Sequence, residues 1–275
     1  MNRLATISAL FAAALLFSLP ATAQKPYEPQ VGQAGKDVIW VPTPDEVVDR
    51  MLRMAQVTKD DLVYDLGAGD GKIAIAAVKK FGARAVGIEY NPEMAKHAQG
   101  NAEKAGVTGK ARIINGDIFV TDFSQATVVT MYLLPQLNIK LRPTILSMRP
   151  GTRVVSHSFT MEDWEADEIS SMDGRRAYFW LVPANVNGGW TLDSGSDKAE
   201  LSFEQRFQKI EGTVGLGPTQ GGLREARLRG FNISFGYVDN AGVKRDYTGR
   251  VTGGKMEGSF RADNGTEGRW TATKK

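Results

Sequence analysis

Residues 63–72 read Val-Tyr-Asp-Leu-Gly-Ala-Gly-Asp-Gly-Lys and stand between an apolar run and a helical pattern. The apolar run at 62–66 predicts a buried strand, and the apolar spacing over 71–81 predicts a helix. Gly67 and Gly69 let the backbone turn sharply and let a ligand approach without a Cβ in the way. The stretch therefore predicts a strand, a glycine-rich binding loop and a helix, in that order.

The same alternation of strand and helix continues on both sides of this loop. Further strands are predicted at 85–89, 111–115, 127–132, 153–157 and 177–182, and further helices at 44–54, 92–105 and 137–148. Strands that alternate with helices imply a mostly parallel sheet with helices on both faces. We place this α/β domain at residues 38–184.

The composition changes after residue 185. Residues 186–275 contain short runs of alternating apolar residues, separated by turns such as Asp-Asn-Ala-Gly at 239–242. Such a pattern predicts a small all-β domain, an antiparallel sheet or barrel. We expect the many aromatic residues of this domain to form its core and not a platform for a ligand.

Acidic residues stand at the ends of three successive predicted strands, at Asp65, Glu89 and Asp117. The glycines follow the order G-x-G-x-G with an acid two residues before the first, whereas a dinucleotide-binding loop follows G-x-G-x-x-G. A carboxylate at this position suits a cationic ligand better than a diphosphate. The cationic nucleoside S-adenosylmethionine, with its sulfonium and ammonium groups, meets that description.

The other two acids fit the rest of the same ligand. Glu89 can accept hydrogen bonds from both ribose hydroxyls, as acids do in other nucleoside-binding α/β folds. Asp117 can accept one from the adenine amino group while Ile118 packs on the ring. For any one of these acids alone the alternative is a helix cap or a solvated loop residue, and for Asp117 alone that alternative is preferred; the three acids together with the glycine loop favour the cofactor.

The glycine loop, Glu89 and Asp117 resemble the motifs of the class I methyltransferases. Over about residues 40–182 the chain is similar to the small protein-lysine methyltransferases of archaea and their mitochondrial relatives. The resemblance implies a Rossmann-like, seven-stranded sheet, a Val-Pro-Thr-Pro segment at 41–44 folding over S-adenosylmethionine, and a strand end at 130–134 facing the substrate. The cofactor contacts it implies are Thr43, Asp65, Gly67, Ala68, Gly69, Glu89, Tyr90, Asp117 and Ile118, and the substrate-channel residues are Tyr132, Leu133 and Leu134.

The acceptor of the methyl group is less well defined by the sequence. Those relatives lack an export signal and a β-rich tail, so the resemblance constrains the fold more than the substrate. Tyr-Leu-Leu-Pro at 132–135 replaces the Asn-Pro-Pro-Tyr of enzymes that methylate amides or nucleobases, which disfavours those reactions. Besides a protein lysine, a small-molecule acceptor and a non-catalytic exported binding protein remain alternatives.

The N-terminus resembles a secretory signal peptide. Residues 1–23 contain an early basic residue, an apolar run and Ala-Thr-Ala, which predicts cleavage after Ala23 and a periplasmic or secreted protein. An uncleaved segment would instead anchor the chain to a membrane. Residues 24–37 are rich in Gly, Pro and Gln and predict a flexible lead-in.

Composition excludes several other functions. The net charge of +3 is spread along the chain, which disfavours a nucleic-acid partner. The chain has no cysteine and only two histidines, so neither disulfides nor a structural zinc site is expected. His157 ends a predicted buried strand and is interpreted as a structural, hydrogen-bonded residue, with a general base as the alternative. Trp40 and Trp164 are candidates for the mouth of the substrate channel, although ordinary packing explains either.

Overall fold

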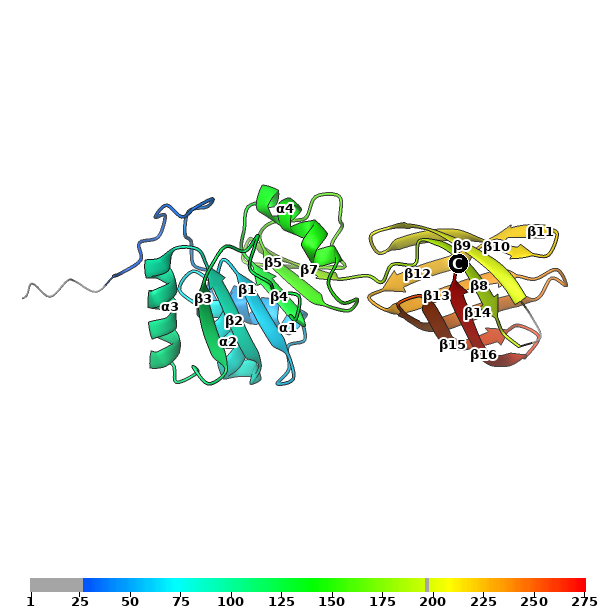
Figure 1. The fold of residues 1–275 in the computed structure, drawn as a ribbon, viewed down its shortest axis with the longest axis horizontal. Helices are drawn as coiled ribbons and strands as arrows, with labels where there is room; N and C mark the ends of the chain where they lie inside the picture. Colours follow the sequence, from blue (N-terminus) through cyan, green and yellow to red (C-terminus); the bar gives the residue numbers. More distant parts are fainter. Residues whose placement is uncertain (1–26, 196–197) are drawn as a thin grey trace, which may run out of the picture.

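A computed structural model describes residues 27–195 and 198–275, which form two lobes side by side (Figure 1). The first lobe is a seven-stranded sheet with helices, and the second is a nine-stranded sheet. The predicted signal peptide at 1–23 lies outside the described residues. Within the described ranges, no helix is both long and apolar enough to span a bilayer.

The first sheet has the strand order β3-β2-β1-β4-β5-β7-β6. Its strands are β1 (Leu62–Leu66), β2 (Arg84–Glu89), β3 (Ala111–Asn115), β4 (Val128–Met131), β5 (Arg153–His157), β6 (Glu168–Met172) and β7 (Arg175–Leu181). The pairs from β3 to β5 are parallel, and β7 runs antiparallel to both its neighbours. This confirms the predicted Rossmann-like, mostly parallel sheet. The order reverses between β1 and β4, and ligands of such sheets bind beside the strand ends at that point.

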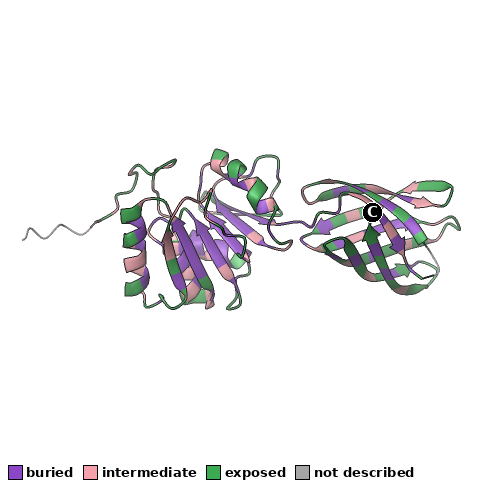
Figure 2. Cartoon of the chain, viewed as in Figure 1, coloured by how far each residue is buried: buried purple, intermediate pink, exposed green. Residues whose placement is uncertain are grey.

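Helices cover both faces of this sheet. They are α1 (Asp45–Met54), α2 (Lys72–Phe81), α3 (Pro92–Lys104) and α4 (Pro135–Leu146). Met51 and Ala77 of α1 and α2 share one buried cluster with Val63, whereas Leu141 of α4 shares another with Leu66. Because alternate residues of a strand point to opposite faces, β1 is buried on both sides. Figure 2 shows the inner strands buried along most of their length.

In the first lobe the structure adds one strand to those identified from the sequence. Strand β6 reads Glu-Ile-Ser-Ser-Met and buries only Ser170, so it carries no apolar signal. It joins β7 through Asp173 and Gly174, which both have positive φ, as a tight hairpin requires. The last helix before β5 begins at Pro135 and not at 137, because proline suits the first turn of a helix.

The second sheet is antiparallel throughout, in the order β11-β10-β9-β8-β16-β15-β14-β13-β12. Its strands are β8 (Gly188–Asp193), β9 (Lys198–Arg206), β10 (Lys209–Leu216), β11 (Thr219–Gly222), β12 (Arg224–Arg229), β13 (Asn232–Val238), β14 (Lys244–Thr252), β15 (Lys255–Ala262) and β16 (Glu267–Lys274). Strands β10 and β12 pack against each other, so the sheet curls into a nearly closed barrel. The expected antiparallel sheet or barrel is confirmed.

Aromatic side chains fill this barrel. The ring of Phe235 lies 5.1 Å from that of Tyr247 and 5.4 Å from that of Trp270, and all three are buried. The hydroxyls of Tyr237 and Tyr247 are 2.8 Å apart inside it. These residues form a packed core, as expected, and not a platform for a ligand.

The two lobes meet at the hairpin between β9 and β10. The ring of Phe207, at the hairpin tip, stacks on that of Trp164 at 5.8 Å between centroids. Lys209 forms an ion pair with Glu165 at 2.7 Å, and Arg206 one with Asp163 at 3.2 Å. Trp164 is therefore fully buried, which confirms ordinary packing for this residue and places it away from the cavity mouth.

Candidate functional site

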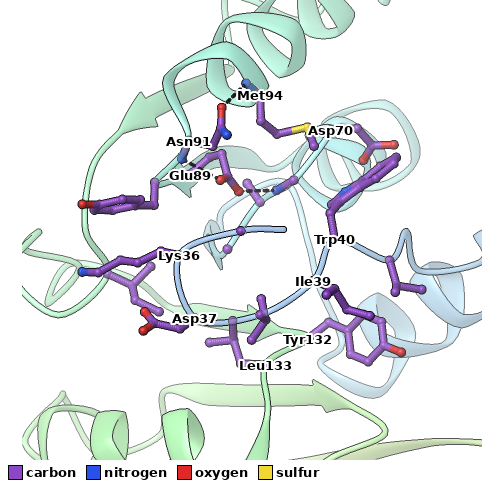
Figure 3. A pocket seen from close by; sticks show the side chains of 18 of the residues that line it. Lys36, Asp37, Ile39, Trp40, Asp70, Glu89, Asn91, Met94, Tyr132 and Leu133 are labelled. Atoms are coloured by element: carbon purple, nitrogen blue, oxygen red, sulfur yellow. Dashed lines mark hydrogen bonds between the residues drawn. The ribbon is translucent and has the colours of Figure 1, made fainter. Parts of the chain in front are cut away.

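A cavity of about 290 Å³ lies at the carboxyl ends of the parallel strands, beneath residues 33–43. Figure 3 shows Glu89 and Asn91 on one side of it and Tyr132 and Leu133 on the other. The residues expected from the sequence that line the cavity are Thr43, Asp65, Gly67, Ala68, Gly69, Glu89, Tyr90, Asp117, Ile118, Tyr132, Leu133 and Leu134. The fold thus brings the predicted cofactor residues together with Tyr132, Leu133 and Leu134, whereas Trp164 lies elsewhere.

The loop after β1 requires its glycines. Gly67 and Gly69 have φ of 79° and 54°, a region that side chains disfavour. A Cβ at Gly69 would lie 2.6 Å from Nε1 of Trp40, and one at Gly67 would lie 3.0 Å from the Leu133 side chain. The backbone N–H groups of Gly67 and Ala68 both donate to the Ile88 carbonyl at 2.9 Å, which ties the loop to β2.

Asp65 is a buried carboxyl group at the floor of the cavity. It is 2% exposed and accepts a hydrogen bond of 2.8 Å from the Thr130 hydroxyl. Burial raises the pKa of Asp65 to about 7, and the negative charges of Asp70 and Glu89 add to the effect. A cation in the cavity would favour the ionised form of this group. The site is therefore suited to a positively charged ligand.

Glu89 is held in a fixed orientation by two backbone N–H groups. Its Oε2 accepts from Gly69 and its Oε1 from Asn91, each at 2.9 Å. Because an ionised carboxylate can accept about four hydrogen bonds, each oxygen keeps capacity for one more. Two oriented acceptors side by side match the two adjacent hydroxyls of a ribose.

Residues 33–43 cover the cavity as a hydrogen-bonded loop. The Gly32 N–H donates to the Trp40 carbonyl at 2.8 Å, and the Trp40 N–H donates to the Gln33 carbonyl at 2.9 Å. The sequence predicted a flexible lead-in over 24–37, but from residue 27 onward the structure places this segment against the first lobe. Its contacts follow no helical or strand period, so the sequence pattern did not reveal them.

Lys36 joins this loop to the opposite side of the cavity. Its Nζ forms an ion pair of 2.7 Å with Asp117 and lies 4.4 Å from the centre of the Tyr90 ring. The hydrogen bond from Lys36 lowers the pKa of Asp117. Asp117 also accepts from the Phe119 N–H at 2.9 Å. Asp117, which the sequence predicts to accept a hydrogen bond from adenine, thus also anchors the covering loop through Lys36.

Apolar side chains form the other side of the cavity. Tyr132, Leu133 and Leu134 line it, together with Leu137 and Phe159, which the sequence analysis did not identify. Leu137 lies in the first turn of α4 and Phe159 lies just after β5, and neither belongs to a sequence motif.

His157 lies behind this apolar side and is buried. The centre of its ring is 4.0 Å from that of Tyr132, and its Nδ1 is 3.2 Å from the Thr43 hydroxyl oxygen. Burial, with a smaller effect from Arg175, lowers the pKa of His157 to about 4. His157 therefore supports two cavity residues from behind while remaining neutral at pH 7.

Comparison with known proteins agrees with this geometry. A family profile described as the ANTKMT methyltransferase domain matches residues 65–168. A protein-lysine N-methyltransferase of Saccharolobus islandicus is 50% identical over 138 residues, which are 50% of this chain and 86% of that protein. A human lysine N-methyltransferase, named for a subunit of ATP synthase, is 31% identical over 48% of this chain, which spans just over half (56%) of that protein's length.

A solved structure is also similar. The crystal structure of an RNA methyltransferase from Salinibacter ruber, in complex with S-adenosyl-L-homocysteine, is 49% identical with a TM-score of 0.52, covering 53% of this chain and 96% of that one. Three findings lead to one assignment: the seven-stranded sheet, the glycine loop with Asp65, Glu89 and Asp117 at one cavity, and 50% identity to the archaeal protein over 138 residues. The chain belongs to the protein-lysine N-methyltransferase family of S-adenosylmethionine-dependent class I methyltransferases.

Proposed function

We propose that this chain transfers methyl groups from S-adenosylmethionine to the ε-amine of lysine in a protein of the cell envelope. The observation that carries the proposal is the cavity itself, where an acid-lined half adjoins an apolar half. The archaeal relative that is 50% identical is named for the same reaction.

The acid-lined half fits the cofactor. Asp65 would face its cationic end, Glu89 its ribose hydroxyls and Asp117 its adenine amino group. Gly67 and Gly69 have no Cβ atoms, as their positive φ favours, and this leaves the cradle open. Bound S-adenosylmethionine supplies an electrophilic methyl group, which passes to a lone pair of the acceptor.

The apolar half suits a lysine side chain. A lysine with an ordinary pKa of about 10.4 must lose a proton before it can attack, which costs about 4–5 kcal/mol at pH 7. Leu133, Leu134 and Leu137 would strip water from the ammonium group, and desolvation lowers the pKa of a lysine. The proton leaves to solvent, and the chain contributes alignment and desolvation instead of a general base.

An RNA acceptor is the second candidate, because the similar Salinibacter ruber structure is named an RNA methyltransferase. The acceptor side of the cavity is apolar and the net charge is only +3, whereas a nucleic-acid surface needs concentrated basic residues. Lysine is therefore the preferred acceptor, and the assay must separate the two.

The assay uses residues 24–275, methyl-labelled S-adenosylmethionine and an envelope extract. We expect label in protein, resistant to RNase and removed by protease, with mass spectrometry locating it on lysine. Glu89→Ala should abolish the labelling and the calorimetric binding of S-adenosylhomocysteine. Label in RNase-sensitive material would replace lysine by RNA as acceptor. A folded chain that binds no S-adenosylhomocysteine would refute the proposal.

The location of the protein is part of the same proposal. The signal-like sequence of residues 1–23 supports export to the periplasm or medium, with a mature chain that begins at Gln24. Cleavage there would leave the covering loop at 33–43 intact. N-terminal sequencing of the protein from fractionated cells tests this. A retained Met1 in the membrane fraction would instead indicate an anchored enzyme.

A further inference from the structure

The backbone takes a strained turn directly after β5. Ser158 has a φ of 63°, and the Phe159 N–H donates to the His157 carbonyl at 2.8 Å, which closes a three-residue γ-turn. A residue other than glycine in this region costs about 1–3 kcal/mol and persists only where its surroundings hold it. Such strain concentrates at functional sites, so the purpose of this turn needs an explanation.

A buried amide holds the turn in place. Asn138 of α4 has no exposed surface, and its Nδ2 donates to the Thr160 carbonyl at 3.1 Å, with longer contacts to the Phe159 carbonyl and the Ser156 hydroxyl. Its Oδ1 is buried without a hydrogen-bond partner. Burying a polar group in this way is costly. Asn138 is therefore unfavourable for stability because of its unpaired Oδ1, while its side-chain amide fixes the course of the backbone over residues 158–160.

The turn places one aromatic side chain at the cavity. Phe159 lines the cavity, and its ring stacks on that of Tyr132, with centroids 5.9 Å apart and planes 21° from parallel. Tyr132 is in turn backed by His157. Tyr132 lies across the cavity from Glu89 (Figure 3), so the aromatic pair is on the side away from the ribose-binding carboxylate.

We infer that Phe159 determines specificity for lysine, and that Asn138 is its positioning residue. This inference rests on the proposed function. The Phe159 and Tyr132 rings would contact the aliphatic stem of the acceptor lysine and attract its ammonium group as it enters. The strained turn and the buried amide set the position of the Phe159 ring, and thereby the width of the entrance.

Kinetics with a defined acceptor test the role of Phe159. The acceptor is poly-L-lysine, with poly-L-arginine as control, and the variants are Phe159→Ala, Phe159→Leu and Phe159→Tyr. Losing the ring should raise the KM for poly-L-lysine about five- to thirtyfold, the range of a cation–π contact, while the Kd for S-adenosylhomocysteine stays within about twofold. Phe159→Tyr keeps the ring and should resemble the wild type. Phe159→Leu preserves most of the side-chain volume but removes the ring, so its KM for poly-L-lysine tests the same contact if the alanine variant folds poorly.

A matched pair at Ser158 tests the turn. Ser158→Gly accepts a φ of 63° without strain and should leave KM unchanged, whereas the β-branched Ser158→Val disfavours it and should raise KM as Phe159→Ala does. Asn138→Ala should raise KM in the same way with little change in kcat. If Asn138 only stabilised the fold, Asn138→Ala would lower the free energy of unfolding without raising KM selectively over kcat.

The outcomes distinguish the two proposals. A wild-type chain that methylates no lysine overturns the proposed function and this inference with it. A wild-type chain that methylates poly-L-lysine, with a KM that Phe159→Ala and Phe159→Leu leave unchanged, overturns this inference alone.

Discussion

The buried carboxyl group of Asp65 should make the first lobe less stable at neutral pH than at acid pH. Its pKa is about 7 in the folded protein and ordinarily 3.8. Because the folded pKa is raised, the stability that the protonated group provides is present below pH 3.8 and is lost as the pH rises to about 7. At 1.36 kcal/mol per pH unit the loss totals about 4 kcal/mol, of which about 3 kcal/mol falls between pH 5 and pH 8.

The variant Asp65→Asn removes this dependence. Asparagine retains an oxygen that can accept the Thr130 hydroxyl, so the hydrogen bond of 2.8 Å has a neutral equivalent. We expect the variant to be about 1–2 kcal/mol more stable than the wild type at pH 5 and about 4 kcal/mol more stable at pH 8. It should also bind S-adenosylhomocysteine poorly, because it lacks the charge that faces the ligand's ammonium group.

Urea unfolding of both proteins at pH 5 and pH 8 measures the effect. In the described residues all four helices lie in the first lobe, so circular dichroism at 222 nm reports on that lobe. Asp122→Asn is the control, since the Asp122 side chain is exposed and its pKa is lowered, leaving it ionised at both pH values. An unchanged stability difference between Asp65→Asn and the wild type across this range would refute the reasoning.

Three further predictions concern the cavity. Gly69→Ala should weaken S-adenosylhomocysteine binding about five- to a hundredfold in calorimetry, since its Cβ would meet the Trp40 ring and its φ is positive. Lys36→Ala should speed ligand dissociation in stopped-flow by at most about fivefold, because an exposed ion pair such as that with Asp117 is weak. An effect that high salt does not diminish would contradict this. His157→Gln should leave the pH dependence of kcat unchanged from pH 6 to 9, because the pKa of His157 is about 4. If the wild type loses activity toward acid pH and the variant does not, His157 is a general base.

The sequence predicted the fold of the first lobe and the identity of its main cavity residues because both depend on regular spacing. Asp65 and Glu89 lie at the ends of β1 and β2, Asp117 lies two residues beyond β3, and parallel strands bring their carboxyl ends to one edge. The positive φ of Gly67 and Gly69 shows why those glycines were informative.

Features that depend on tertiary contacts were not predictable in this way. Lys36 lies 81 residues from its partner Asp117, and no local pattern connects them. Phe159 reaches the cavity only through a turn held by Asn138 of another element. Strand β11 contains two glycines and has no buried residue, so it carries no apolar alternation.

The stacking of Phe207 on Trp164 has a consequence for dividing the chain. Trp164 follows the strained turn by only a few residues and is fully buried. A fragment that stopped at Ala184 would expose one face of this indole to water and bring an apolar patch to its surface. We expect such a fragment to aggregate unless Trp164 is replaced by a polar residue. The barrel therefore protects an apolar surface of the first lobe from water, and the solubility of the first lobe depends on a residue of the second.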